Sequence, residues 1–290
     1  MTKNKRNTYL IGVSIEITEC TNKKATYMKT NICKQLKEQS PLIHCITNPI
    51  SIMQCANVVL LLGARPIMSE HPGEVREITA SAKALLLNFG NVTRDRLEAI
   101  KISYDEAMQK EIPVVIDAVG VACSELRRSV VKKMICIGKR NPKVPMLIKG
   151  NYSEIRALFD DGYKSSGVDA DKKLTLEEMI DIAAKLAQNL NAIVLASGEK
   201  DIVSDGNKTA VIGNGTKKLG SITGTGCMLG AVCASFFAAD TSIESIVNAT
   251  AAFGISGENA EGDMFLMRLF DAIADINDDI IEERKKVTWH

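Results

Sequence analysis

A Gly-Thr-Gly-Cys turn occupies residues 224–227, at the point where a loop becomes a long apolar segment. Gly224 and Gly226 flank Thr225 and allow backbone N–H groups to converge on one point. A helix that begins at Cys227 adds unpaired N–H donors and the positive end of its dipole. The turn is therefore predicted to form an anion hole, suited to the charge that develops on a transferring phosphoryl group.

Cys227 is the candidate base of this site. A thiol at the start of a helix is expected to have a lowered pKa, so that some thiolate exists near neutral pH. The thiolate could then take the proton of a substrate hydroxyl as that oxygen attacks phosphorus. The alternative from sequence alone is a glycine-rich loop that closes the core over a buried, inert cysteine.

Two acids offer a place for Mg²⁺, which usually takes one or two carboxylates together with waters and phosphate oxygens. Asp117 ends the run IPVVID, and Glu154 follows the run VPMLIKG by a few residues. Lys149 could neutralise phosphate oxygens, and Ser197 ends a further apolar run. Local alternatives remain open, namely a loop-capping Asp117, a helix N-terminal Glu154 and a solvated Lys149.

Four short apolar runs are predicted to be buried strands that position these residues. They are ALLLNF (84–89), IPVVID (112–117), VPMLIKG (144–150) and NAIVLASG (191–198). Helical patterns separate them, and this alternation favours parallel strands with helices on both faces. Ligands of such sheets bind outside the carboxyl ends of the strands. The sequence therefore predicts a three-layer α/β/α fold with a mainly parallel central sheet.

Glycine and proline mark further elements. A helix is predicted to end at Gly63, and another to begin close to Pro72. Residues 201–212 have the pattern of a hairpin, and residues 160–173 that of a polar surface loop. The chain after residue 241 is predicted to form two helices.

Composition excludes several classes of function. Hydrophobic residues make up 46% and charged residues 24% of the 290 residues, which is typical of a soluble globular protein. A formal net charge of +1 and an aromatic content of 4% argue against nucleic-acid and membrane-surface partners. No apolar run is long enough to span a bilayer, and no G-x-x-x-x-G-K-[ST] motif indicates a P-loop protein.

The cysteines and the N-terminal segment bear on the compartment. The eight cysteines include no C-x-x-C pair, which favours reduced, mostly buried thiols in the cytoplasm. Glu16 and Glu19 interrupt the first apolar stretch, so a signal peptide is not predicted. Residues 1–27 lack helical periodicity, and we expect a poorly ordered extension there, with translation from Met28 as one hypothesis. Residues 28–290 are expected to form a single domain.

Several ordered motifs together resemble one family. The segments SPLIHCITNPIS, GARPIMSE, IPVVIDAVGV, IKGNYSEI, ASGEKDIVSDG and TGTGCMLGA are similar to those of hydroxyethylthiazole kinases, thiamine-salvage enzymes of the ribokinase-like superfamily. The resemblance runs from about Ser40 to the last helix. Most relatives in the superfamily carry an aspartate as base in the turn, and a cysteine at Cys227 is a mark of the thiazole kinases.

The resemblance implies an ATP- and Mg²⁺-dependent phosphorylation of the primary alcohol of 4-methyl-5-(2-hydroxyethyl)thiazole. Cys227 would deprotonate the hydroxyethyl group. The backbone from Gly224 through Thr225 to Gly226 would form the anion hole, and Gly224 would also lie near the thiazole. Asp117 and Glu154 would organise Mg²⁺.

The resemblance also implies binding residues and an assembly. Lys149 occupies a position often filled by an arginine that contacts ATP, and Ser197 one often filled by a threonine that does the same. Met68 would line the thiazole pocket through its backbone, and Asn48 would lie on the substrate side. Family members are homotrimers with the pocket between subunits. Core filling by Met68 and a turn role for Asn48 remain the local alternatives, and His44 is expected to be structural.

Besides Lys149 and Ser197, two residues of one segment depart from the family pattern. Ala118 replaces a proline and Ala122 a glycine in the segment DAVGVAC, which bears on nucleotide affinity. The competing hypotheses are another ribokinase-like kinase of a vitamin or sugar alcohol, and a nucleotide- or thiazole-binding protein with impaired turnover. A thiol acyltransferase is less favoured, because no His–Asp partner stands near Cys227 in the sequence.

Overall fold

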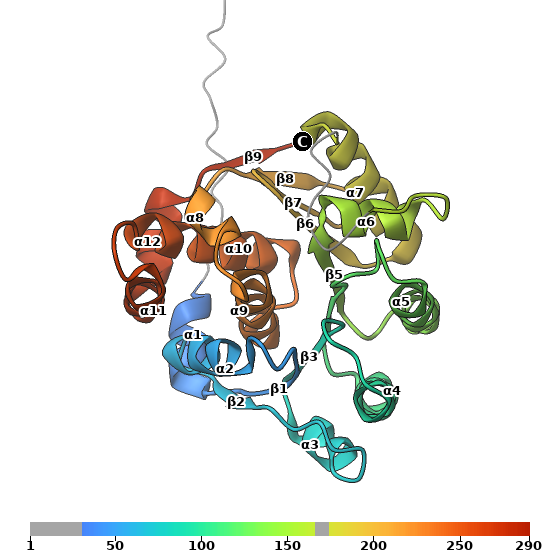
Figure 1. The fold of residues 1–290 in the computed structure, drawn as a ribbon. Coiled ribbons are helices and arrows are strands. Elements are labelled where there is room, and N and C mark those ends of the chain that lie inside the picture. Colours follow the sequence, from blue (N-terminus) through green and yellow to red (C-terminus); the bar gives the residue numbers. More distant parts are fainter. Residues whose placement is uncertain (1–30, 166–173) are drawn as a thin grey trace, which may run out of the picture.

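The computed structural model of the protein describes residues 31–165 and 174–290 (Figure 1). The predicted extension over residues 1–27, with Met28, lies outside the described residues, as do residues 166–173 of the surface loop predicted over residues 160–173. The elements are α1 Ile32–Gln39, β1 Leu42–Ile46, α2 Ile52–Leu61, β2 Arg65–Ile67, α3 Val75–Ser81, β3 Ala84–Asn88, α4 Arg94–Lys110, β4 Val114–Asp117, α5 Glu125–Gly138, β5 Met146–Asn151, α6 Tyr152–Phe159, α7 Leu176–Leu190, β6 Ile193–Ser197, β7 Asp201–Ser204, β8 Thr209–Ile212, α8 Lys217–Gly220, α9 Thr225–Ala239, α10 Ile243–Asn259, α11 Phe265–Asp275, α12 Asp278–Arg284 and β9 Val287–Trp289.

One sheet of nine strands runs through the described part of the chain in the order β2-β1-β3-β4-β5-β6-β7-β8-β9. The strands from β2 to β6 pair in parallel, and those from β6 to β9 pair in antiparallel fashion. The mainly parallel sheet is thus confirmed. The four apolar runs form β3, β4, β5 and β6, and residues 201–212 form the β7–β8 hairpin.

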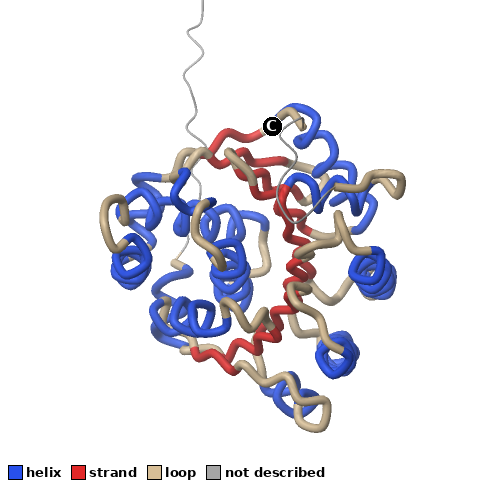
Figure 2. The backbone as a smooth tube through the Cα atoms, in the orientation of Figure 1, coloured by secondary structure: helices blue, strands red, loops and turns tan. Residues whose placement is uncertain are grey.

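Helices cover both faces of this sheet and give the three predicted layers (Figure 2). Helices α1, α2 and α9 to α12 pack on one face around a core that includes most of α9 and α10. Helices α3 to α7 cover the other face, around a second core. Helix α9 is apolar on all sides because it lies between the sheet and the outer helices, as a fully buried helix must.

Register aligns the strand ends that carry the candidate residues. Asn88 at the end of β3 pairs with Asp117 at the end of β4, and Asp117 pairs with Lys149 in β5. Asn151, at the end of β5, pairs with Ser197 at the end of β6. Parallel pairing therefore places these polar residues in one row along the carboxyl edge of the sheet.

The sequence pattern failed at the two ends of the domain. The short strands β1, β2 and β9 were not predicted, and the chain after residue 241 forms three helices and a strand instead of two helices. The last predicted helix breaks at Ile276, which is extended, and Asn277 caps α12 by accepting a hydrogen bond from the backbone N–H of Ile280. Helix α3 begins at Val75, three residues after Pro72, because a turn comes first.

Gly63 follows the end of α2 with φ +90°, as the prediction of a glycine stop requires. A search of the described residues for a helix long and apolar enough to cross a membrane finds none.

Candidate active site

The Gly-Thr-Gly-Cys turn starts helix α9, which begins at Thr225. Gly224 has φ +97°, and a Cβ there would lie 3.1 Å from the Cβ of Ser51, so both conformation and space favour glycine. The Thr225 hydroxyl lies 2.6 Å from the carbonyl oxygen of Leu219 and anchors the turn from within the protein. A Cβ at Gly226 would lie 3.9 Å from Lys149 Nζ. The start of α9 therefore lies next to a lysine ammonium group.

Cys227 lies at the centre of a polar cluster and is 9% exposed. Asn88 Nδ2 lies 3.3 Å from Cys227 Sγ and 2.9 Å from Asp117 Oδ2, so one amide group donates to both. The side-chain oxygen of Asn88, Oδ1, accepts a hydrogen bond from the Gly90 N–H, and this contact fixes the orientation of the side-chain amide. Sequence reasoning missed Asn88, although it ends its strand as Asp117 ends the next one.

The prediction of a lowered thiol pKa at Cys227 is wrong. Burial and the neighbouring Asp117 carboxylate raise the pKa of Cys227. The Lys149 ammonium and hydrogen bonds with Ser51 and Asn88 act in the opposite direction but do not outweigh them. The helix start alone does not decide the charge of this thiol, because the thiol is buried and lies beside a carboxylate.

Asp117 and Lys149 form a buried ion pair. Lys149 Nζ lies 3.0 Å from Asp117 Oδ1, and the two side chains are 4% and 0% exposed. Burial opposes the charge on Lys149, but Asp117 and the other negative groups around it raise the pKa of the lysine. Burial likewise raises the pKa of Asp117, against Lys149 and Asn88, whose hydrogen bonds favour the carboxylate. The pair is charged, because Asn88 and Lys149 both donate hydrogen bonds to Asp117, and these bonds favour the ionised carboxylate and the ammonium group. Lys149 is therefore not a solvated lysine, and Asp117 is not a loop cap.

Glu154 is held by backbone amides. Its Oε2 accepts from the Asn151 N–H at 2.7 Å, and Asn151 Oδ1 accepts from the Glu154 N–H at 2.9 Å, which completes a capping box at the start of α6. Its Oε1 accepts from the N–H of Gly120, a residue with φ +79°. Burial raises the pKa of Glu154 to about 7, against these two backbone hydrogen bonds. The sequence left open whether Glu154 caps the N-terminus of a helix, and these hydrogen bonds show that it does.

The side chains of Asp117 and Glu154 are carboxylates, the type of protein ligand that Mg²⁺ prefers. Across the described residues, no group of three or more histidine, cysteine and acidic side chains could hold a metal ion. Each of the two carboxylates accepts two hydrogen bonds from the protein and keeps about two of its roughly four lone-pair positions. Such a pair fits a cation that takes the rest of its ligands from phosphates and water.

The remaining predicted residues have their own local contacts. Asn48 Oδ1 accepts from the Ile50 N–H at 3.0 Å, so its side chain forms a turn. Ser197 is the last residue of β6, and its Oγ lies 3.4 Å from the carbonyl oxygen of Gly150 in β5. Met68 directly follows β2 and is partly buried against the core. His44 is buried and hydrogen-bonded to Thr79 Oγ1 and to the Ser69 carbonyl oxygen, both at 2.9 Å, as befits a structural residue.

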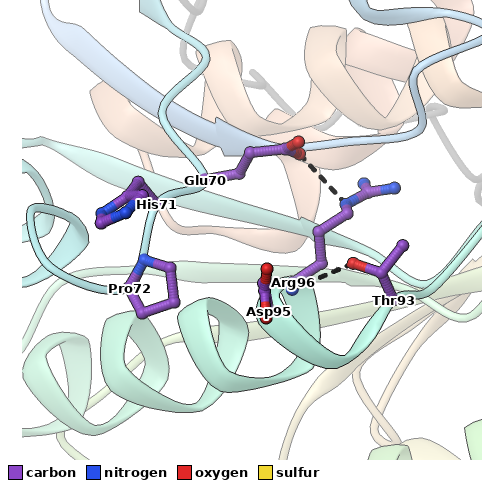
Figure 3. Close-up of a pocket in the computed structure, with 6 residues that line it drawn as sticks. All are labelled: Glu70, His71, Pro72, Thr93, Asp95 and Arg96. Carbon is purple, nitrogen blue, oxygen red and sulfur yellow. Dashed lines mark hydrogen bonds and ion pairs between the residues drawn. The ribbon is translucent and has the colours of Figure 1, made fainter.

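A pocket of about 500 Å³ is lined by Glu70, His71, Pro72, Thr93, Asp95 and Arg96 (Figure 3). Neither Cys227 nor any other residue predicted for the site belongs to this lining.

The architecture belongs to a known class. A ribokinase-like superfamily protein of Enterococcus faecalis superimposes with a TM-score of 0.57 at 13% identity, over 85% of this chain and 88% of that chain. At this identity the likeness concerns the fold alone. The three-layer arrangement is therefore a ribokinase-like fold.

Closer relatives narrow the class to a family. The profile of the hydroxyethylthiazole kinase family matches residues 33–279. Hydroxyethylthiazole kinase 2 of Clostridium botulinum strain Hall is 42% identical over 267 residues, which cover 88% of this chain and 98% of the relative. The structure of the hydroxyethylthiazole kinase of Pyrococcus horikoshii matches with a TM-score of 0.79 at 30% identity, over 89% of this chain and 97% of that chain. The protein belongs to the hydroxyethylthiazole kinase family.

Proposed function

We propose that the protein transfers the γ-phosphoryl group of ATP to the primary alcohol of 4-methyl-5-(2-hydroxyethyl)thiazole. The hydroxyl oxygen attacks the γ-phosphorus, the bond from that phosphorus to the β,γ-bridging oxygen breaks, and ADP leaves. The observation that carries this proposal is the convergence of the α9 start, Cys227, Asp117 and Lys149 at one edge of the sheet. Family membership supports the choice of acceptor.

The start of α9 stabilises the transferring group. The backbone N–H groups of Gly224, Thr225 and Gly226 form the anion hole, and the dipole of a fifteen-residue helix adds to their effect. Lys149 provides a positive charge beside Gly226, and Lys149 and Ser197 contact ATP. Gly224, Met68 and Asn48 contact the thiazole. These roles are consistent with a positively polarised turn in a site from which water is largely excluded.

Asp117 and Glu154 hold Mg²⁺ in this proposal. When bound, the ion neutralises charge on the phosphate oxygens and orients the γ-phosphoryl group. Asp117 also sets the electrostatics of the resting site, because its carboxylate contacts both Lys149 and Asn88.

Cys227 accepts the proton of the hydroxyl group. Because burial and Asp117 raise the pKa of its thiol, the base form is scarce at neutral pH and becomes more abundant as pH rises. The kcat of the enzyme should therefore increase on the alkaline side of neutrality. The variant Cys227→Asp should keep activity and lose this alkaline rise, since an aspartate base is ionised at lower pH.

The test is direct. The protein is incubated with the hydroxyethylthiazole, ATP and Mg²⁺, and the phosphorylated thiazole is sought by mass spectrometry. The phosphorylated thiazole is expected to form with Mg²⁺ and not to form when Mg²⁺ is chelated. Folded protein that binds ATP and yields no phosphorylated thiazole would overturn the assignment, and a panel of vitamin and sugar alcohols would then identify the acceptor.

A homotrimer with shared pockets is part of the proposal. Ile50, Met53 and Leu60 on or beside α2 are 62%, 67% and 56% exposed, and Met264 and Met267 at α11 are 74% and 56% exposed. Helices α2 and α11 pack together, so these apolar side chains belong to neighbouring elements. Burial of such a surface favours association with further copies. Light scattering coupled to size-exclusion chromatography measures the assembly, and a monomer would contradict it.

The compartment and the domain extent complete the proposal. The cysteines in the described residues are free thiols, which supports a reducing, cytoplasmic location. We further propose that residues 28–290 form one kinase domain.

A further inference from the structure

Arg96 is a buried arginine with an unusual number of backbone partners. Arg96 is 3% exposed, although it lies in the first turn of α4, where its backbone N–H donates to the side chain of the Thr93 N-cap. Nη1 donates to the carbonyl oxygens of Asn91 at 2.8 Å and Gly90 at 3.4 Å, and Nη2 donates to that of Thr47. Nε forms an ion pair with Glu70 at 3.1 Å, which Figure 3 draws as a dashed line between two of the residues that line the pocket.

The position is unfavourable for a cation on local grounds. A positive charge in the first turn of a helix meets the positive end of the dipole, and burial adds a desolvation cost. Burial lowers the pKa of Arg96, and Glu70 partly offsets this effect. The carbonyl oxygens and Glu70 compensate for both costs. A residue that breaks a local rule and needs this many partners is a candidate for a role beyond stability.

The partners of Arg96 lie on three loops, and each loop carries or directly adjoins a residue of the proposed site. Thr47 directly precedes Asn48. Gly90 and Asn91 follow Asn88, whose amide contacts Cys227 and Asp117. The third loop contains Met68 and, two residues later, Glu70.

Two of these loops also contact each other. A Cβ at Gly90 would lie 2.5 Å from Asn48 Nδ2 and 3.0 Å from Asn88 Oδ1. The turn after β3 therefore packs directly on the side chain of Asn48, and a shift of either loop would move both asparagines. One guanidinium group fixes the distance between them, because its planar fork binds several carbonyl oxygens in fixed directions.

We propose that Arg96 is a positioning residue for the acceptor side of the site. It touches neither reacting group, and it acts by holding the loops that carry Asn48, Asn88 and Met68 in register. This inference deepens the proposed function and rests on its assignment of the acceptor side. The proposed ATP residues, Lys149 and Ser197, belong to β5 and β6 and share no hydrogen bond with Arg96 among those that the structure gives.

The kinetic test compares Arg96→Gln with a matched control, Arg76→Gln. Arg76 Nη1 forms an ion pair of 2.8 Å with the buried Glu106, so the control also removes an arginine–glutamate pair at α4 but leaves the three loops intact. KM is measured for the thiazole at saturating ATP, and for ATP at saturating thiazole. In Arg96→Gln we expect kcat/KM for the thiazole to fall by about 10–100-fold, the scale of a small misplacement, with KM for ATP within about twofold of the wild-type value.

The control should leave both KM values close to those of the wild type. Equal changes for the two substrates in Arg96→Gln, or equal effects in the two variants, would show that Arg96 serves stability alone and would overturn the proposal. Should Arg96→Gln fail to fold, Glu70→Gln carries the test, because it removes the tie to the Met68 loop and leaves the carbonyl contacts of Arg96. It is expected to raise KM for the thiazole with KM for ATP unchanged, and an unaltered thiazole KM would count against the proposal.

Amide hydrogen exchange separates this inference from the assignment of the acceptor. In Arg96→Gln, peptides covering residues 47–51 and 88–92 should exchange faster, while Arg76→Gln leaves them as in the wild type. This outcome is independent of which alcohol the enzyme phosphorylates. Unchanged exchange in both peptides would overturn the positioning role even if the thiazole proves to be the substrate.

Discussion

Two buried carboxylates, Asp117 at the end of β4 and Glu154 in the first turn of α6, are held in different ways. Asp117 is bound by side chains from neighbouring strands, namely Asn88 and Lys149. Glu154 is bound by backbone N–H groups of Asn151 and Gly120. One carboxylate therefore depends on the identity of other side chains, and the other depends on the path of the chain.

The difference has consequences for charge. Asp117 belongs to a network in which a lysine, an amide and the Cys227 thiol share hydrogen bonds or charge. A change in any member alters the others, because they interact in a site of low dielectric. Within the described residues, Glu154 accepts its hydrogen bonds from backbone N–H groups, at the start of α6 and at the turn of Gly120. The charges of Asp117 and Lys149 also act on its pKa, but less than burial and these two hydrogen bonds. Substitutions at the two carboxylates can therefore compare what holds each of them.

The largest effect is expected from Cys227→Ala, which removes the proposed base from the Asp117 network. Turnover should fall by about 10²–10⁴-fold, the usual contribution of a positioned base, while ATP binding is retained. Single-turnover kinetics and calorimetric titration with ATP measure the two properties. Cys233→Ala is the matched control, because Cys233 is buried in the same helix six residues later and should leave turnover close to the wild-type value. Full turnover in Cys227→Ala would remove the thiol from the mechanism.

The next effect concerns the stability of the side-chain network. Asp117→Asn leaves the Lys149 ammonium buried without its counter-charge, and the free energy of unfolding should fall by about 3–5 kcal/mol. The double variant Asp117→Leu with Lys149→Met removes both charges and should recover most of this loss without recovering turnover. Urea denaturation of the three proteins measures these changes. If the single variant were as stable as the wild type, Asp117 and Lys149 would not be a charged pair.

Glu154→Gln probes the carboxylate held by the backbone, where the effect should depend on pH. With a pKa raised from 4.5 to about 7, folded Glu154 retains a proton that the unfolded chain has already lost. The free energy of unfolding of the wild type therefore falls as pH rises through this window. The variant lacks this slope and loses hydrogen-bond acceptors, so it should be less stable by about 1–3 kcal/mol at the acidic end of the window and closer to the wild type at neutral pH.

Urea denaturation across that window provides the measurement, and Glu178→Gln provides the control. Glu178 forms the same type of capping box with Thr175 at the start of α7, but it is exposed and its hydrogen bonds with Thr175 lower its pKa. Since the pKa of Glu178 is lowered, its titration is complete below the window in which Glu154 titrates, and the slope should remain as in the wild type. Parallel pH curves for Glu154→Gln and the wild type would refute the raised pKa.

The central part of the fold could be predicted from the sequence, and its edges could not. Strands β3 to β6 are short, buried, apolar runs that end in polar residues, and periodicity identifies such strands directly. Strand β2 has three residues and lies at the sheet edge, and β9 pairs only with β8 near the chain terminus. Their formation depends on pairing with strands distant in sequence, which no local pattern reveals.

The candidate site, too, could be predicted from the sequence only in part. The positions of Asp117, Lys149 and Cys227 at one edge follow from strand order and from the glycine turn. The charge state of Cys227 could not be predicted, because a helix start was the only feature visible locally. Burial and the approach of Asp117 arise from tertiary packing. Arg96 was likewise invisible to sequence reasoning, since its partners lie on loops that are far apart along the chain.

The smallest effect is expected at Ala118, where the chain departs from the proline of its family pattern. The Ala118 N–H donates to the Lys149 carbonyl oxygen at 2.8 Å, and this bond extends the β4–β5 ladder directly behind the Asp117–Lys149 pair. Proline cannot make it. At Ala122, which replaces the glycine of the family pattern, the backbone does not have the positive φ that would favour glycine, so alanine fits without strain.

In Ala118→Pro the two consequences oppose each other. Loss of the hydrogen bond leaves the buried Lys149 carbonyl oxygen without this donor and costs about 1–3 kcal/mol, which exceeds the about 0.4–1 kcal/mol that the restricted unfolded chain returns. The free energy of unfolding should therefore fall by about 1–2 kcal/mol, and KM for ATP should remain close to the wild-type value. A much larger loss of stability, together with a raised KM for ATP, would show that the backbone bond to Lys149 supports the side-chain network. In that case Asp117 would depend on the path of the chain as Glu154 does, and the contrast between the two carboxylates would no longer hold.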